Sequence, residues 1–410
     1  MKMMKDTIKE IEGGVCSPKG FKAGAIHCGI KKNGGTDLAL IASDVLAAAA
    51  GVYTKNKVKG APIAVTKKNI EDGKAKAIIC NSGNANTCAP NGMFIAEKTC
   101  ELLGAALNCK GEDIIVASTG VIGVPMEIQP FETGIPQLVE KIHDKGANEA
   151  AVGIMTTDTK EKEIAVEFMV GNTLCKLGGM AKGSGMIHPN MATMLSFITG
   201  DTKISGEMLQ QALSEVVEDT FNQVSVDGDT STNDTVAILC NGLAGNEEIA
   251  QEGEAYDQFK AALLWVMTVL SKEIAADGEG AGKLMEVEVF GAPDVKVARL
   301  VAKSIISSSL FKAALFGEDA NWGRILCAIG YTDAEFSADN ISVEMESAGG
   351  KLLFCENSGA VGFSEEKAKK ILKEDQVRFI IDLNDGDGHA FAWGCDLTYD
   401  YVKINGDYRS

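Results

Sequence analysis

The chain has 410 residues, of which 45% are hydrophobic and 23% are charged, and this composition is ordinary for a globular protein of two or three domains. Its 57 acidic residues outnumber its 39 basic residues and give a formal net charge of −18. Because a field of that sign repels polyanions, nucleic acids and anionic membrane surfaces are not expected as partners.

Short runs of β-forming residues dominate the first third of the chain, and each ends at Gly, Pro, Asn, Asp or Lys. Between these runs, apolar residues recur at helical spacing over 93–107 and more weakly over 135–142. The alternation predicts an α/β fold, with strands in the first third at 39–42, 63–66, 77–80 and 114–117.

The clearest predicted helix covers 205–221, where Ser205 can cap the first turn and apolar residues form one stripe. A second helix, over 256–275, is apolar on most of its surface and is expected to be buried. Further strands are predicted at 287–303 and 341–354, and further helices at 310–316 and 365–372. Since no linker marks a boundary, we place it after the buried helix, which gives a large domain 1–284 and a C-terminal domain 285–410.

The cysteines argue for a reducing compartment, because the eleven of them are scattered and form no CxxC pair. The N-terminal stretch 1–22 has no continuous apolar run, and the longest strongly apolar helical run, 261–270, is too short to span a bilayer. These features predict a cytoplasmic protein.

The segment 178–195, GGMAKGSGMIHPNMATML, is unusually rich in glycine and carries one isolated threonine. A long surface loop is the plainest interpretation. A phosphate-binding loop does not fit, because no GK[ST] follows at the required spacing. The segment GEGAGK at 278–283 also fails this test, since Asp277 stands at the first glycine position and Leu284 follows the lysine.

Ala192 and Thr193 suggest a different chemistry. A threonine hydroxyl is a poor nucleophile without a base, and no Ser/His/Asp arrangement stands beside Thr193. Cutting the preceding peptide bond frees an α-amine with a pKa near 8, which can accept the hydroxyl proton. The small Ala192 permits the strained turn that such a cut requires. The residues are therefore compatible with self-cleavage between 192 and 193 and with Thr193 as the nucleophile.

The same segment resembles the cleavage and nucleophile signature of the ornithine acetyltransferase family, also called bifunctional glutamate N-acetyltransferase. Further stretches match that family in the expected order, and the resemblance covers nearly the whole chain: NSGNAN (81–86), STGVIG (118–123), MTTDT (155–159), DGEGA (277–281), GEDANWGRI (317–325) and a tail with Asn405 and Ser410. It implies a layered αββα-type domain with a smaller C-terminal α/β domain.

The resemblance also implies an activity. The chain is expected to cut itself into an α chain, 1–192, and a β chain from 193, which stay together in an α2β2 heterotetramer. Thr193 then takes the acetyl group of N-acetylornithine as an ester, and glutamate displaces it to give N-acetylglutamate in arginine biosynthesis. No cofactor is implied, and the use of acetyl-CoA as a second donor stays open.

By the same resemblance, Thr119 and Gly120 stabilise the oxyanion, with a hydroxyl and a backbone N–H as donors. The substrate-contacting positions are Thr156, Lys182, Thr193, Glu279, Asn405 and Ser410. Lys182 is expected to pair with the α-carboxylate shared by both substrates, or to assist the cut, and Glu279 to meet a substrate ammonium. Asn405 and Ser410 would bring the tail over the site. Taken singly, each of these residues also fits an ordinary loop position.

No metal site is predicted. Asp227, Asp229 and Asp234 in VDGDTSTND lack the register and terminal Glu of a calcium loop, so we expect turn or packing roles. One departure from the family is Gly282, where a threonine is frequent; we expect the loop carrying Glu279 to be more mobile here, which leaves the acceptor preference open.

Two other functions remain compatible with the sequence. A self-processing aminopeptidase would use the same threonine but resolve the acyl-enzyme with water. A non-catalytic acidic binding protein would not be cut at all.

Overall fold

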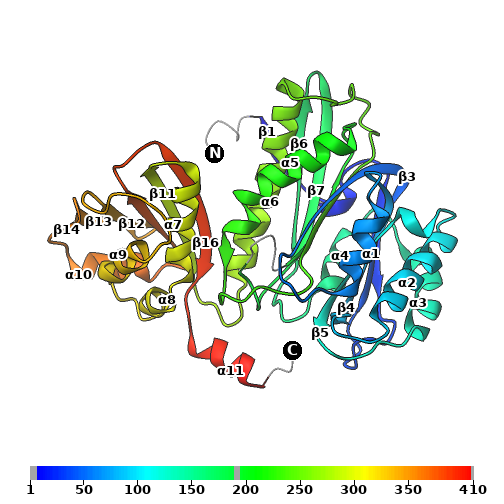
Figure 1. Cartoon of the computed structure of the whole chain (residues 1–410), viewed down its shortest axis with the longest axis horizontal. Coiled ribbons are helices and arrows are strands. Elements are labelled where there is room, and N and C mark those ends of the chain that lie inside the picture. Colours follow the sequence, from blue (N-terminus) through cyan, green and yellow to red (C-terminus); the bar gives the residue numbers. More distant parts are fainter. Residues whose placement is uncertain (1–6, 189–193, 408–410) are drawn as a thin grey trace.

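The structure is a computed structural model that describes residues 7–188 and 194–407. Within these ranges the strands form one nine-stranded and one seven-stranded sheet (Figure 1). The larger sheet has the order β1-β6-β7-β8-β10-β3-β4-β5, with β2 paired to β3. Its strands are β1 (Ile8–Ile11), β2 (Phe21–Ile26), β3 (Leu38–Tyr53), β4 (Lys74–Asn84), β5 (Ile114–Val121), β6 (Lys162–Val170), β7 (Thr173–Lys182), β8 (Leu195–Gly200) and β10 (Thr235–Cys240).

Helices cover both outer faces of this sheet, and one further helix lies between its two halves. They are α1 (Ala61–Asn69), α2 (Gly92–Ala106), α3 (Gln129–Lys141), α4 (Ala147–Ile154), α5 (Gly206–Glu218) and α6 (Glu254–Ala276). The first three pack on the half formed by β2 to β5, while α5 and α6 pack on β6, β7, β8 and β10. A third apolar cluster, which includes α4, joins the inner faces of the two halves.

Strand β4 shows how the layers arise from the period of two in a strand. Ile78 and Cys80 belong to the inner cluster, while Ala77 and Ile79 face the outer helices. The long strand β3 contributes to all three clusters and has a register shift against β4 between Ala42 and Ala47. The sheet therefore folds over itself, and the predicted αββα layering of an α/β protein is confirmed.

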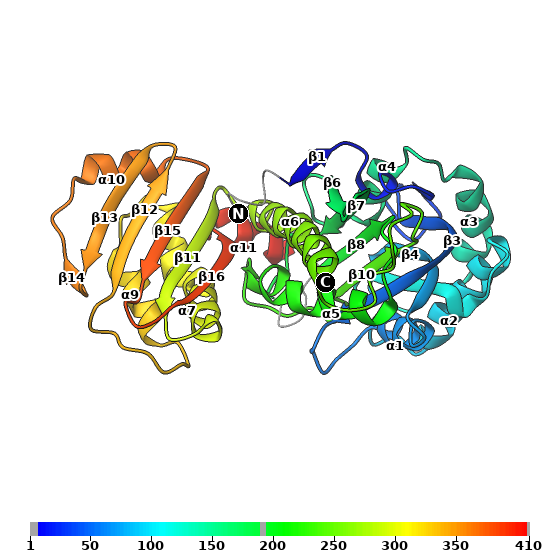
Figure 2. The ribbon, with the colours of Figure 1, turned by 90° about the horizontal axis from the view of Figure 1, so that it is seen from above.

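The seven-stranded sheet has the order β14-β13-β12-β15-β11-β16-β9 and packs its apolar face on helices (Figure 2). Helix α6 contacts its strand β16, so the two sheets meet along that helix. The elements are β9 (Val224–Ser225), β11 (Leu284–Ala292), β12 (Ser342–Ser347), β13 (Gly350–Glu356), β14 (Gly359–Ala360), β15 (Gln376–Asp382), β16 (Gly388–Cys395), α7 (Val295–Ser307), α8 (Ser309–Phe316), α9 (Trp322–Gly330), α10 (Glu365–Leu372) and α11 (Tyr399–Asp407).

Most of the expected elements are present, including the helix capped by Ser205, whose hydroxyl accepts a hydrogen bond from the Met208 N–H at 3.2 Å. Two expected strands are wrong. Residues 63–66 belong to α1, where Pro62 occupies the first helical turn, a position that tolerates its missing N–H. Of 287–303, only the first part is β11; the second is α7, which Asp294 caps and whose apolar residues share one helical face.

No helix in the described ranges is both long enough and apolar enough to cross a bilayer.

Candidate active site

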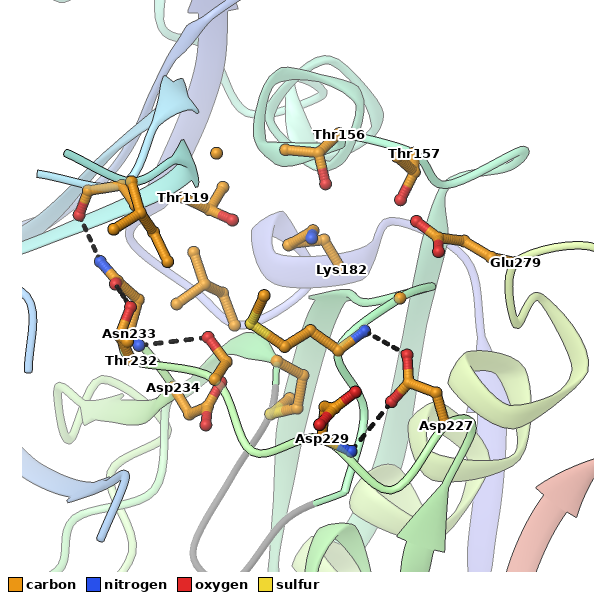
Figure 3. A pocket seen from close by; sticks show the side chains of 18 of the residues that line it. Thr119, Thr156, Thr157, Lys182, Asp227, Asp229, Thr232, Asn233, Asp234 and Glu279 are labelled. Carbon is orange, nitrogen blue, oxygen red and sulfur yellow. Dashed lines mark hydrogen bonds between the residues drawn. The ribbon is translucent and has the colours of Figure 1, made fainter. Parts of the chain in front are cut away.

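A cavity of about 570 Å³ lies where several strands of the larger sheet end (Figure 3). It brings together every described residue of the predicted site: Thr119, Gly120, Thr156, Lys182, Glu279 and Asn405. Ala192, Thr193 and Ser410 lie outside the described residues. Met194, the residue after Thr193, lines the cavity.

The predicted oxyanion pair stands at the end of β5. There β5 pairs with β4 through a bulge at Gly83 and Asn84. Gly120 has φ +131°, and a Cβ added to it would come within 2.3 Å of the Gly83 carbonyl carbon. Only glycine fits at this position, and without a side chain its backbone is exposed to the cavity. The Thr119 side chain points into the same cavity (Figure 3).

Lys182, the last residue of β7, is the cation of this cavity and is 7% exposed. Its Nζ lies 3.7 Å from Asp158 Oδ2. Asp158 also accepts hydrogen bonds from Lys162 Nζ at 2.8 Å and from the backbone N–H groups of Thr156 and Gly183. Burial favours the neutral form of Asp158, but the two lysines outweigh it and hold its pKa below the usual range. Asp158 therefore stays ionised and fixes Lys182.

Glu279 follows α6 and is 8% exposed. Its N–H donates to the Ser184 carbonyl at 3.0 Å, and its Oε2 accepts from Asn405 Nδ2 at 2.8 Å. A Cβ on Gly185 would come within 2.3 Å of the Glu279 carboxyl, so a side chain there would require this carboxyl to move. Glu279 is thus held against both the glycine-rich segment and the C-terminal helix.

The backbone at Gly282 is anchored by hydrogen bonds, although residue 282 itself has no side chain. The N–H groups of Gly282 and Lys283 both donate to Asp396 Oδ1, at 2.8 and 3.0 Å. A Cβ at Gly282 would stand 3.1 Å from the same carboxylate. The expected greater mobility of this loop stays a prediction.

Helix α11 reaches the cavity from the C-terminal part of the chain and places Asn405 and Tyr401 in its wall. The Tyr401 hydroxyl donates to Asp227 Oδ2 at 3.3 Å, and burial raises the pKa of this phenol, which keeps its proton. Asp227 in turn accepts from the N–H groups of Met186 and Ile187, at 2.6 and 2.9 Å. Asp227 thus anchors the backbone of the glycine-rich segment, and Tyr401 is a residue that the sequence did not point to.

The glycine-rich segment connects β7 to β8, which pair in antiparallel fashion with Lys182 opposite Leu195. Beside it, Asn233 donates from Nδ2 to the carbonyls of Ala85 and Ser118, and so joins the start of β10 to the end of β4 and to β5. Asn233 and Asp234 both line the cavity, although the sequence indicated only turn or packing roles for their segment. The sequence feature that could have indicated these two residues is the polar run directly before an apolar strand.

The arrangement suits acyl transfer better than metal chemistry. None of the four histidines lines the cavity, and all of them lie in the described part of the chain. In the described ranges no group of three His, Cys, Asp or Glu side chains is placed to hold a metal ion. Among the described residues that line the cavity, the reactive and binding groups are hydroxyl groups, the buried cation Lys182 and the buried acids Glu279 and Asp234.

Comparison with known proteins gives a family match and a similar full-length relative of the same family. A sequence model of the ArgJ family matches residues 22–410. The arginine biosynthesis bifunctional protein ArgJ 1 of Clostridium acetobutylicum is 48% identical over 407 residues, which are 99% of this chain and 100% of that protein.

Two solved structures are similar as well. A chain of the arginine biosynthesis bifunctional protein argJ of Bacillus halodurans is 47% identical, with a TM-score of 0.50, and all of it matches 53% of this chain. A chain of the ornithine acetyltransferase of Mycobacterium tuberculosis, solved in complex with ornithine, is 36% identical, with a TM-score of 0.42, and all of it matches 45% of this chain.

Proposed function

The chain belongs to the ArgJ family, and we propose that it is an acyltransferase of arginine biosynthesis that moves the acetyl group of N-acetylornithine to glutamate. The acetyl group passes through an ester on Thr193, which becomes an N-terminal residue when the chain cuts itself after Ala192. The observation that carries this proposal is the convergence of Thr119, Gly120, Lys182 and Glu279 on the same cavity that Met194 lines.

In the first half of the reaction, the Thr193 hydroxyl oxygen attacks the acetyl carbonyl carbon of N-acetylornithine. The oxyanion that forms accepts hydrogen bonds from the Gly120 N–H and the Thr119 hydroxyl, each worth about 3 kcal/mol in such sites. The α-amine of Thr193 takes the hydroxyl proton and gives it to the departing ornithine nitrogen. In the second half, the glutamate amine attacks the ester and releases N-acetylglutamate.

The charges of the cavity support these substrates. Both amino acids carry an α-carboxylate, for which the buried Lys182 is a partner. Glu279 is a buried acid that favours a substrate ammonium. Thr156 and Asn405 add neutral hydrogen-bonding groups. Ser410 is proposed as a further substrate contact. No imidazole lines the cavity, which supports an amine as the base.

The proposed cut also fits the size of a solved relative. The Bacillus halodurans chain is fully matched by 53% of this chain. Residues 193–410 are 218 of 410 residues, which is the same share. We propose that the two products remain together, that two copies of each form an α2β2 heterotetramer, and that the enzyme works in the cytoplasm. Acetyl-CoA as a second donor is a separate prediction, which release of free CoA would test.

Intact-mass spectrometry with and without N-acetylornithine tests the mechanism. Two fragments divided between 192 and 193 are expected, with one acetyl group added to the fragment that begins at Thr193. Full turnover by an uncut chain, or by a Thr193→Ala variant, would contradict the mechanism.

The aminopeptidase alternative makes a different prediction for the same mixture. With N-acetylornithine and glutamate present, a hydrolase releases acetate, whereas the transferase forms N-acetylglutamate. The family match over nearly the whole chain favours the transferase.

A further inference from the structure

Asp234 is a buried carboxyl in the cavity wall that the transfer reaction does not use. It is 2% exposed and lines the cavity (Figure 3). Met194 lines the same cavity. Among the residues that the structure describes, its Oδ2 has no hydrogen-bond partner. A buried acceptor left unpaired costs about 1–3 kcal/mol, so a functional reason for it is worth seeking.

The sheet places Asp234 level with the start of the chain that follows the proposed cut. Strands β8 and β10 run parallel, with Leu195 opposite Thr235. One residue earlier, the Thr235 N–H donates to the Met194 carbonyl at 3.1 Å. Asp234 is the residue before Thr235, and Met194 is the residue before Leu195. Asp234 therefore lies beside Met194, which is bonded to Thr193. This position follows from the described strands alone.

Burial of Asp234 favours the neutral form of its carboxyl. Burial raises its pKa well above the ordinary value. The Ser231 and Thr54 hydroxyls, the charge of Lys182 and the Met194 N–H act in the opposite direction and are smaller effects. A neutral carboxyl has one O–H that donates and a second oxygen that accepts. It can therefore give one proton as a general acid and take another as a general base.

We propose that Asp234 is the acid–base group of self-cleavage: its O–H donates a proton to the nitrogen of Thr193 while its other oxygen takes the proton of the Thr193 hydroxyl. The inference rests on the proposed function. The Thr193 oxygen bonds to the Ala192 carbonyl carbon, and the carbon–nitrogen bond breaks. An ester and a free amine replace an amide and a hydroxyl, and Asp234 regains its proton. Water then hydrolyses the ester to the Ala192 carboxylate and the Thr193 hydroxyl.

This role separates self-cleavage, which forms the active enzyme, from acetyl transfer. Once the amine is free, it can serve as base in acetyl transfer, and Asp234 is needed only before that point. Lys182, which the resemblance also connects with the cut, then contributes charge rather than a proton.

Asp234→Asn tests the proposal, because the amide has the shape of the neutral acid and keeps a donor and an acceptor but cannot pass on its proton. We expect intact mass to show the variant uncut, with cleavage slowed at least 100-fold, and a melting temperature close to that of an uncut Thr193→Ala reference.

Asp201→Asn is the matched control. Asp201 is 1% exposed, burial raises its pKa too, and it accepts backbone N–H groups of Lys176 and Lys19 away from the cavity. This control should cut like the wild type. Cleavage of Asp234→Asn within tenfold of the wild-type rate overturns the proton role.

A second measurement covers the case in which Asp234→Asn does not fold. The wild-type chain is made by cell-free translation, and its cutting is followed from pH 6 to pH 10. The rate should fall as pH rises through the pKa of Asp234, because the ionised form has no proton to donate. A rate that rises throughout the range overturns the inference. A wild-type chain that is never cut removes the proposed function itself, and this inference with it.

Discussion

At two glycines of the cavity, an added side chain would collide with a neighbouring group of the proposed site. A Cβ on Gly120 would meet the Gly83 backbone at 2.3 Å, and one on Gly185 would meet the Glu279 carboxyl at 2.3 Å. Gly120 also has φ +131°, a conformation that L side chains rarely adopt. A side chain at either position must therefore displace a group that the proposed reaction uses, either the oxyanion donor or the acid.

The substitution Gly120→Ala should lower kcat by about 10²-fold or more, because moving one oxyanion donor costs that much in comparable enzymes. Steady-state formation of N-acetylglutamate measures it. Gly330→Ala is the control, since a Cβ there meets nothing within 4 Å. Near-normal turnover of the Gly120 variant would show that this N–H does not stabilise the oxyanion.

At the level of elements, one buried lysine connects the ends of several strands and helices. Lys162, the first residue of β6, is fully buried and donates to Asp158 at 2.8 Å and to Asp277 at 2.5 Å. Asp158 fixes Lys182 at the end of β7, and Asp277 accepts from Thr159 and precedes Glu279 after α6. The relative placement of the cation and the acid in the cavity thus depends on a residue that does not line it.

Replacing Lys162 by Met should destabilise the protein by about 3–5 kcal/mol, because two buried carboxylates lose their shared partner. The melting temperature measures this loss. Lys260→Met is the control: its bridge to Glu215 joins side chains that are 35% and 42% exposed, and such pairs contribute about 0–1 kcal/mol. Equal melting temperatures for the two variants would contradict the prediction.

Helix α11 should respond to charge at Asn405. Asn405→Asp places a second carboxylate against Glu279 Oε2, where the amide now donates at 2.8 Å. We expect KM for both substrates to rise and amide hydrogen exchange in α11 to quicken. Asn405→Ala, which loses the bond without adding charge, should show a smaller change in both measurements. Equal effects of the two variants would mean that charge plays no part.

For the whole molecule, a half-buried carboxyl on α6 links stability to pH. Burial raises the pKa of Glu273 to about 7, with Glu163 and Glu10 adding to the shift and Lys160 and Lys162 opposing it. Its Oε2 has no hydrogen-bond partner among the described residues. The folded state therefore holds this proton more tightly than the unfolded state, and the stabilisation is complete only below the unfolded pKa of about 4.3.

Stability should fall as pH rises from about 4.5 to about 7 because of this group, and Glu273→Gln should remove that part of the dependence. At pH 8 the variant is expected to be more stable by about 1–2 kcal/mol, since one pKa unit corresponds to about 1.4 kcal/mol and the side chain is only partly buried. Melting temperature against pH measures it, with the exposed Glu248→Gln as control. An unchanged profile in Glu273→Gln would contradict the assignment.

The sequence by itself determined the elements whose signals are local and the site residues whose motifs are long. Ser205 with its apolar stripe sufficed for α5, and the quoted motifs singled out Thr119, Gly120, Lys182, Glu279 and Asn405, which the structure brings to one cavity. Residues 63–66 and the second half of 287–303 were misassigned, because their β-branched residues prefer strands while burial of one face favours helices.

Only the tertiary structure decided what depends on contacts between distant segments. The folding of one sheet into two layers, the pairing of β8 with β10 and the approach of α11 set Asn233, Asp234 and Tyr401 around the cavity. Lys162 acquires its function in the same way, from an aspartate 115 residues away. Short-range propensity carries no information about such partners, and burial, which fixes their charge and hydrogen bonding, arises only once the layers have packed.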